Sequence, residues 1–150
     1  MLIRAKVIWM TSGLLAVVVL GASLLLQMVP AQPRSAIKTA RSLVDGLRAR
    51  ELERAYRLTT RRGEVGGSLA EFQAIVRQQW PATIPTSVRF ETVRPFQSHG
   101  NRLRRWLHGR EVDPPQLWLE FSVDGVPFTV REVRAGGGEW KVDYFESHAG

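Results

Sequence analysis

The sequence predicts an α+β domain in which about three helices pack on a curved antiparallel sheet, preceded by one transmembrane helix. Two patterns predict the domain. Apolar residues recur at helical spacing in the first half of the chain, whereas they alternate with polar residues in the second half. A third observation, the uncharged run from Val7 to Val29, predicts the transmembrane helix.

The apolar run follows a short N-terminus that carries Arg4 and Lys6. At about 1.5 Å per residue, a helix over the run reaches roughly 35 Å, which exceeds a hydrocarbon core of about 30 Å. We therefore expect a signal-anchor over residues 1–30, a linker over 31–35 and an extracytoplasmic domain over 36–150. This topology describes a single-pass protein of the cell (inner) membrane with its N-terminus inside.

A cleaved signal peptide is the alternative to this anchor. Signal peptides usually have an apolar region of about 7 to 15 residues, which is shorter than this run. Cleavage after Ala31 stays open, because Val29, Pro30 and Ala31 place small or apolar residues where a signal peptidase could cut. In both cases the domain that follows is exported.

Composition bounds the remaining chemistry. The chain has no cysteine, which excludes disulfides, thiolate metal sites and a lipid-modified cysteine anchor. All 14 acidic residues and all but two of the 21 basic residues follow the apolar run, so the domain is moderately basic. Such a charge suits anionic headgroups or an acidic protein partner.

Three helices are expected in the first half of the domain. The first covers residues 36–47 behind Ser35, a candidate N-cap, and the second covers residues 52–59. Ser68 and Glu71 form a capping box at the start of the third helix, which Pro81 ends.

Strands are expected in the second half. A strand begins at Ser87, with Val88, Phe90 and Thr92 on one face. Asp124-Gly125 separates two alternating runs and predicts a tight hairpin turn. A two-residue loop pairs Val123 with Val126, Phe121 with Phe128 and Leu119 with Val130, and it places Arg131 beside Trp118. Trp140, Val142 and Tyr144 mark a last strand.

Three segments resemble the nuclear-transport-factor-2-like superfamily, particularly its small bacterial membrane-anchored envelope members without assigned activity. They are the helical ERAYRLT at 53–59, the capped SLAEF at 68–72 and the closing GEWKV at 138–142. The resemblance implies a curved sheet wrapped around helices into a cone, often with a pocket and often dimeric through the sheet. It implies no particular chemistry, since this fold hosts enzymes, ligand binders and assembly modules.

The expected inner face of the sheet is apolar, and Glu120 and Asp143 fall on the opposite face. Several aromatic side chains are candidates for a ligand pocket, with filling of the core as the alternative. These candidates are Tyr56, Phe72, Phe90, Phe121, Phe128, Trp140 and Tyr144. Tyr56 and Tyr144 are the candidate hydroxyl donors if the cone holds an isomerase-like or hydrolase-like site.

A basic segment between the strand patterns is the candidate contact surface for a partner or for lipid headgroups. Its candidate residues are Arg102, Arg104, Arg105, Trp106 and Arg110. The alternative is an ordinary strand pair with arginines in water. Nucleic acid is not an expected partner of an exported domain with moderate charge.

No catalytic residue, metal site or cofactor is predicted. His99, His108 and His148 match no zinc-binding spacing, and Gly136 to Gly138 is expected to be a turn. The leading functional hypothesis is a non-catalytic accessory or assembly subunit of a membrane or envelope protein complex, with a homodimer through the sheet as a further expectation. The alternative is a small-ligand-binding module or an enzyme that uses the cone cavity.

Overall fold

The computed structural model describes residues 20, 21, 23, 24 and 29–148. Most of the run from Val7 to Val29, and with it the expected transmembrane helix, lies outside these residues. No helix within the described part of the chain has the length and apolar character needed to cross a membrane.

The chain forms two compact units. We call Pro33–Phe96 together with Asp113–Gly150 the sheet unit, and Met1–Gln32 together with Gln97–Val112 the α5 unit. The sheet unit holds the helices α2 (Arg34–Arg48), α3 (Leu52–Arg57) and α4 (Leu69–Gln79), the short turns η1 (Gly63–Val65) and η2 (Gly136–Gly138), and the strands β1 (Val88–Arg94), β2 (Gln116–Val123), β3 (Val126–Arg134) and β4 (Trp140–Ser147). The predicted α+β class is confirmed.

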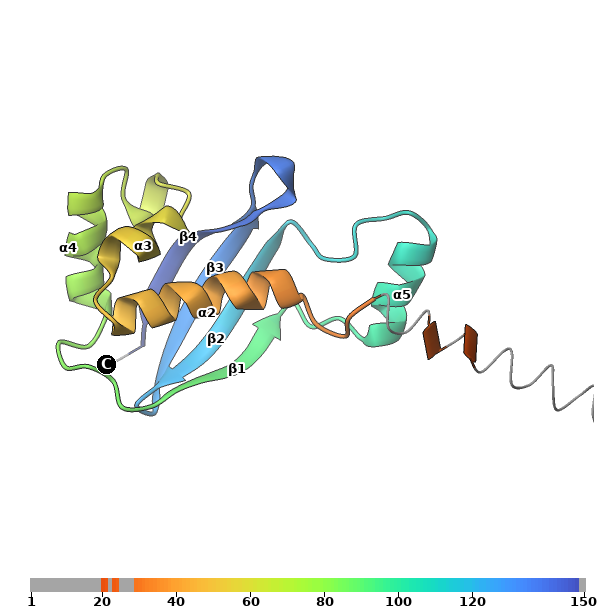
Figure 1. Cartoon of the computed structure of the whole chain (residues 1–150), viewed down its shortest axis with the longest axis horizontal. Helices are drawn as coiled ribbons and strands as arrows, with labels where there is room; N and C mark the ends of the chain where they lie inside the picture. Colours follow the sequence, from red (N-terminus) through yellow and green to blue (C-terminus); the bar gives the residue numbers. More distant parts are fainter. Residues whose placement is uncertain (1–19, 22, 25–28, 149–150) are drawn as a thin grey trace, which may run out of the picture. The chain divides into compact units, whose positions relative to one another are not determined.

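Helix α2 lies across one face of the sheet and contacts β2, β3 and β4 (Figure 1). Its apolar residues recur every three or four positions, so one side of the helix is buried while the other carries charge. Ser35 is not the N-cap, contrary to the prediction: the helix begins two residues earlier, at Arg34, and Pro33 stands at the cap position without a side-chain hydrogen bond.

The predicted N-cap of α4 is confirmed. Ser68 Oγ accepts a hydrogen bond from Glu71 N at 3.2 Å. The returning bond of the capping box goes one residue further back than expected, since Gly67 N donates to Glu71 Oε2 at 2.7 Å. Trp80 ends the helix just before Pro81, as the sequence predicts.

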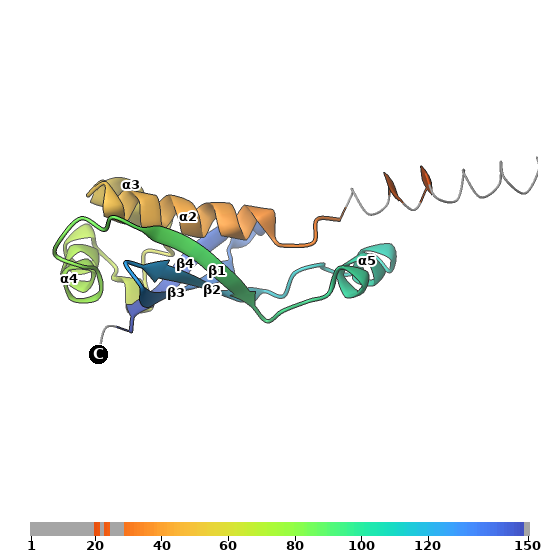
Figure 2. The same cartoon turned by 90° about the horizontal axis from the view of Figure 1, so that it is seen from below.

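The four strands are antiparallel in the order β1-β2-β3-β4. The Asp124-Gly125 turn sets the β2-β3 register as predicted, with Val123 opposite Val126 and Phe121 opposite Phe128. Both turn residues have a positive φ, 49° at Asp124 and 84° at Gly125. We call the face toward α2 the inner face and the opposite face the outer face. Figure 2 shows α2 and α3 together on the inner side of the sheet.

Two irregularities change which side chains face inward. The register of β1 against β2 shifts between Phe90 and Thr92, so Val93, not the predicted Thr92, is buried at 7% exposure. The register of β3 against β4 shifts between Arg131 and Glu132, so Phe145 replaces the predicted Tyr144 on the inner face. A bulge reverses the alternation of every residue beyond it.

The segment after α3 extends the sheet beyond β4. Thr59 forms an isolated parallel bridge with Val142. Thr60 N donates to Val142 O at 2.8 Å, and Val142 N donates to Leu58 O at 3.0 Å. The middle of this edge strand is therefore hydrogen-bonded on both sides.

Candidate functional site

The basic segment between β1 and β2 forms a helix, α5 (His99–Leu107), and not the strand pair considered as an alternative. Ser98 caps it, because its side chain accepts a hydrogen bond from Asn101 N at 3.3 Å. The helix ends at Leu107 with His108 as its C-cap, and Gly109 follows with φ of 64°, a left-handed conformation that glycine adopts without steric cost. Arginines near the C-terminal end also suit the negative end of the helix dipole.

Arg102 is buried, with 4% of its surface exposed. The sequence predicts that this side chain contacts a partner or lipid headgroups, and its burial contradicts that prediction. Its Nε donates to the carbonyl oxygen of Pro30 at 2.8 Å. Val29, which precedes Pro30, is also buried at 2% exposure. Arg102 therefore ties α5 to the residues that directly follow the apolar run.

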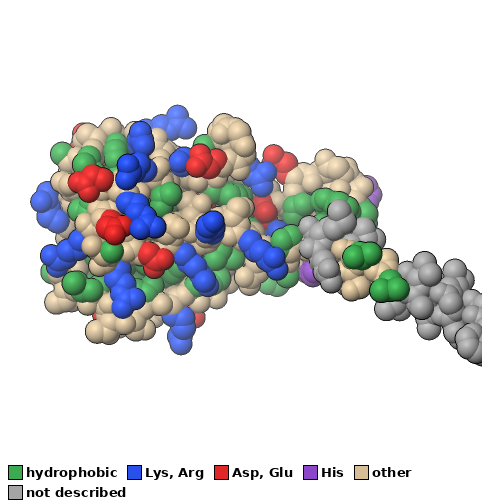
Figure 3. All heavy atoms as spheres, in the orientation of Figure 1, with side chains coloured by type: hydrophobic (Ala, Val, Ile, Leu, Met, Phe, Trp, Pro, Cys, Tyr) green, Lys and Arg blue, Asp and Glu red, His purple; other side chains and the backbone are tan. Residues whose placement is uncertain are grey.

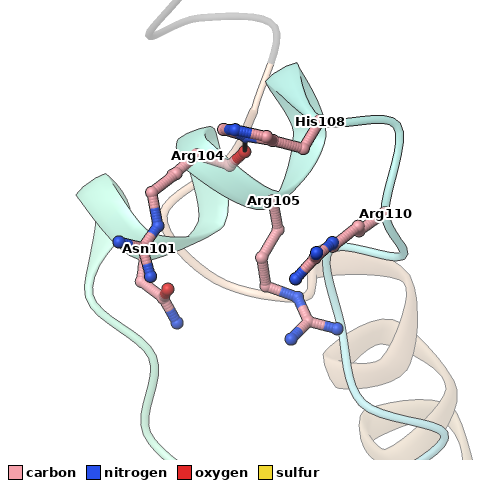
Figure 4. Close-up of a pocket in the computed structure, with 5 residues that line it drawn as sticks. All are labelled: Asn101, Arg104, Arg105, His108 and Arg110. Carbon is pink, nitrogen blue, oxygen red and sulfur yellow. Dashed lines mark hydrogen bonds between the residues drawn. The ribbon is translucent and has the colours of Figure 1, made fainter.

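The other predicted arginines line a surface cavity of about 250 Å³. Figure 4 shows Asn101, Arg104 and Arg105 on the helix, His108 at its C-cap and Arg110 just after the turn that follows. We call these five residues the α5 cavity. Two hydrogen bonds hold its walls: His108 Nδ1 donates to Arg104 O at 2.7 Å, and Arg105 Nε donates to Glu111 O at 2.7 Å. A carbonyl only accepts, so His108 Nδ1 carries a proton.

Positive charge in the α5 cavity is not neutralised by the described residues. Arg104, Arg105 and Arg110 form no ion pair with any of them. In the sheet unit, four arginines, at 54, 89, 94 and 131, each pair with a carboxylate, whereas exposed ones such as Arg57, Arg62 and Arg77 form none of these pairs. Figure 3 shows acidic side chains interspersed among the basic ones on the visible face of the sheet unit. The α5 cavity gathers three such arginines with no carboxylate in its lining, so it is suited to a mobile anion.

Two large apolar side chains accompany these arginines. Trp106 is 36% exposed and Leu107 is 59% exposed. Helix α5 therefore presents cations and apolar groups from the same short element, a combination found at membrane interfaces and at protein contacts.

Most of the predicted pocket aromatics are core residues. The buried ones are Phe72, Phe121, Phe128 and Trp140, none more than 4% exposed. They pack against other rings, as where Phe128 meets Trp80 with centroids 5.1 Å apart. Phe90 is half-buried and lines, with Phe121, a cavity of about 380 Å³ beside α2 and β1. These positions support filling of the core over a deep pocket.

The structure does not bring the two candidate tyrosines together. Tyr56 packs against Phe72 near the helices, with ring centroids 5.4 Å apart. Tyr144 lies on the outer face, where its ring is 6.0 Å from that of Trp118. Its hydroxyl donates to Glu146 at 2.5 Å, and this hydrogen bond raises the pKa of Tyr144 to about 12. The Tyr144 hydroxyl is thus committed to Glu146.

The inner face carries one acidic side chain that sequence reasoning missed. Glu132 on β3 is fully buried, lies between Leu117 and Val142 in the sheet register, and has no hydrogen-bond partner for either carboxylate oxygen. Desolvation raises its pKa to about 9, so the carboxyl is protonated at neutral pH. The sequence alternation could have placed Glu132 on the inner face, because every second residue of a strand points to the same side and Glu132 follows Phe128 and Val130 at that spacing.

An ordered polar and aromatic cluster occupies the outer face. The Arg131 guanidinium lies 5.3 Å from the Trp118 ring centroid and 5.1 Å from that of Tyr144. Its Nε donates to Asp143 Oδ1 at 2.9 Å and its Nη2 donates to Glu64 Oε2 at 2.7 Å. The hydrogen bond with Asp143 is the main cause of the raised pKa of Arg131. The predicted contact between Arg131 and Trp118 is confirmed.

The described residues contain no group of three or more histidines or carboxylates arranged to hold a metal ion. His108 lines the α5 cavity, whereas His148 Nε2 lies 3.1 Å from the Thr129 hydroxyl.

Comparisons of the chain with protein-family models, curated proteins and solved structures gave no match. The resemblance to the nuclear-transport-factor-2-like superfamily therefore stays a prediction.

Replacing Arg102 with alanine is expected to loosen α5 without unfolding the sheet unit. The variant loses a buried charged donor and leaves Pro30 O without it, a change that should lower the local opening free energy of α5 by about 2 kcal/mol. Hydrogen exchange of the α5 amides in the full chain measures this quantity. Arg104→Ala is the control, because that side chain is exposed, and equal exchange in the two variants would contradict the structural role of Arg102.

Proposed function

We propose that this chain is a single-span membrane protein whose extracytoplasmic domain acts as a non-catalytic accessory or assembly subunit of an envelope membrane complex. The observation that carries the proposal is the Arg102 hydrogen bond to Pro30. It holds the basic helix α5 at the end of the apolar run, which is long enough to span a bilayer. The run supplies the anchor, and α5 stays next to it.

The outer face of the sheet is the proposed docking surface for another subunit. Trp, Tyr and Arg are the residue types that contribute most to binding at interfaces. Trp118, Tyr144 and Arg131 occur there side by side, and the carboxylates of Asp143 and Glu64 fix the guanidinium between the rings. A preorganised surface of this kind loses little side-chain entropy on binding.

Site-specific photo-cross-linking in the native membrane tests this function. A benzoylphenylalanine at position 118 of the full chain is expected to capture a membrane-embedded protein of a different sequence. The same group at position 57, where Arg57 is exposed on α3, should not capture it. Capture of a second copy of the chain alone would instead support the homodimer. Extraction of the chain by alkaline carbonate would contradict the membrane span.

A small-ligand-binding module is the second candidate function. It is favoured by the cavity of about 380 Å³ beside α2 and β1. In this cavity the Arg41 guanidinium lies 5.5 Å from the ring centroid of Phe90, so a cation and an apolar surface adjoin. The cross-linking experiment separates the two candidates, because a free ligand binder needs no partner at position 118.

A further inference from the structure

We infer that the α5 cavity binds the phosphate group of anionic membrane lipids. This inference rests on the proposed membrane span, because the span is what places the cavity near headgroups. It assigns α5 to the bilayer surface and leaves the outer face of the sheet to a protein partner.

The chemistry of the cavity selects an anion with several oxygen acceptors. Its lining consists of three arginines, one histidine and one asparagine, and it includes no carboxylate. Guanidinium groups present forked N–H donors that match two phosphate oxygens at once. The Asn101 amide can add a neutral donor beside Arg104.

Internal hydrogen bonds prepare the cavity for its ligand. Arg105 uses Nε to bind Glu111 O, so its terminal nitrogens are held in place with their donors available. The bond from His108 Nδ1 to Arg104 O fixes the imidazole ring on the cavity wall. Groups fixed in this way lose little freedom when an anion binds.

The place of α5 in the chain favours a lipid phosphate over a free phosphate ion. Arg102 binds Pro30, and Pro30 directly follows the apolar run. A helix held there lies at headgroup level when the run spans the bilayer. Trp106 and Leu107 are exposed on the same helix, and tryptophan is enriched at this interface because its ring is partly polar and partly apolar.

Native mass spectrometry of the full chain in neutral detergent tests the inference. Phosphatidylglycerol and phosphatidylcholine with the same acyl chains are offered as competitors. The wild-type chain is expected to retain the anionic lipid preferentially. Replacing Arg104, Arg105 and Arg110 together by glutamine should reduce that retention by roughly a hundredfold, or about fivefold for each arginine.

Two variants control for folding and for net charge. Arg110→Gln alone leaves the helix untouched and is expected to lower retention about fivefold. The matched control replaces Arg57, Arg62 and Arg77 by glutamine, since these arginines are exposed in the sheet unit and form none of the ion pairs found there. It removes the same charge and should keep the wild-type preference.

Three outcomes would overturn the inference. The first is equal retention of phosphatidylglycerol by the wild-type chain and both α5 variants. The second is displacement of the lipid by inorganic phosphate at equal concentration, which would assign the cavity to the free ion. The third is loss of a co-purifying protein in the α5 variants with unchanged lipid retention. If alkaline carbonate extracts a chain that still selects phosphatidylglycerol, that result contradicts the membrane span but not lipid binding by the α5 cavity.

Discussion

Raising the pH from about 5 to about 9 is expected to lower the free energy of unfolding by roughly 5 kcal/mol through Glu132 alone. Desolvation raises the pKa of this buried carboxyl from 4.5 to about 9. In this interval the folded chain keeps the proton that the unfolded chain releases. The stability contribution is therefore fully present below the unfolded pKa and is lost as the pH rises to the folded pKa.

Glu132→Gln is the variant that isolates this effect. The slope of unfolding free energy against pH should differ between the wild type and the variant by about 1.4 kcal/mol per pH unit within the interval. Urea unfolding of the full chain in detergent at several pH values measures the slope. Glu139→Gln should keep the wild-type slope, because the Glu139 side chain is 65% exposed. An unchanged slope in Glu132→Gln would mean that Glu132 is ionised in the folded chain.

Gly66→Ala is expected to destabilise the chain by about 4 kcal/mol, because strain and overpacking act together. Gly66 has φ of 85° and ψ of 141°, a conformation essentially restricted to glycine. A Cβ at this position would lie 2.8 Å from Phe72 N and 2.9 Å from Glu71 Cβ. The first contact is with backbone at the start of α4, so relief requires the helix to move.

Gly63→Ala is the matched control for the steric part of this effect. Gly63 also has a positive φ, 63°, but a Cβ there would meet nothing within 4 Å. The control should cost about 1 kcal/mol from backbone strain alone. Urea unfolding of both variants gives the difference. Equal losses would show that α4 does not constrain Gly66.

Local signals in the sequence were sufficient for the hairpin and for the start of α4. Asp124-Gly125 fixes the loop length, and the loop length fixes each pair from Val123 and Val126 onward. Ser68 and Glu71 specify the N-terminus of α4 within a few residues. Both are short-range arrangements, so no knowledge of the tertiary fold is needed.

The errors in the predicted sheet arose at the two bulges. A bulge adds one residue to one strand, and nothing in the alternation around Thr92 or Tyr144 marks its position. The predicted inner face was therefore correct up to each bulge and inverted beyond it. Glu132 was missed for a different reason. Phe128 and Val130 alternate with it on the same face of β3 and are apolar, so the inner face was predicted to be apolar throughout.

The candidate site on α5 was predictable in composition but not in structure. Arginines and Trp106 stand out in the sequence, yet only a few apolar residues mark the helical period over 99–107. The burial of Arg102 depends on Pro30, which is 72 positions away. A contact at that separation leaves no local signal, so the sequence could not distinguish the structural arginine from those that line the α5 cavity.

The bridge between Thr59 and Val142 limits how copies of this chain can associate. An open strand edge is a template for another strand, but the backbone groups of Val142 at the β4 edge are already bonded to Leu58 and Thr60. The opposite edge, β1, is interrupted by its bulge and carries Arg89, Glu91 and Arg94. Copies anchored in one bilayer by the proposed span would meet at high local concentration. The closed edge would let them crowd together without polymerising through their sheets.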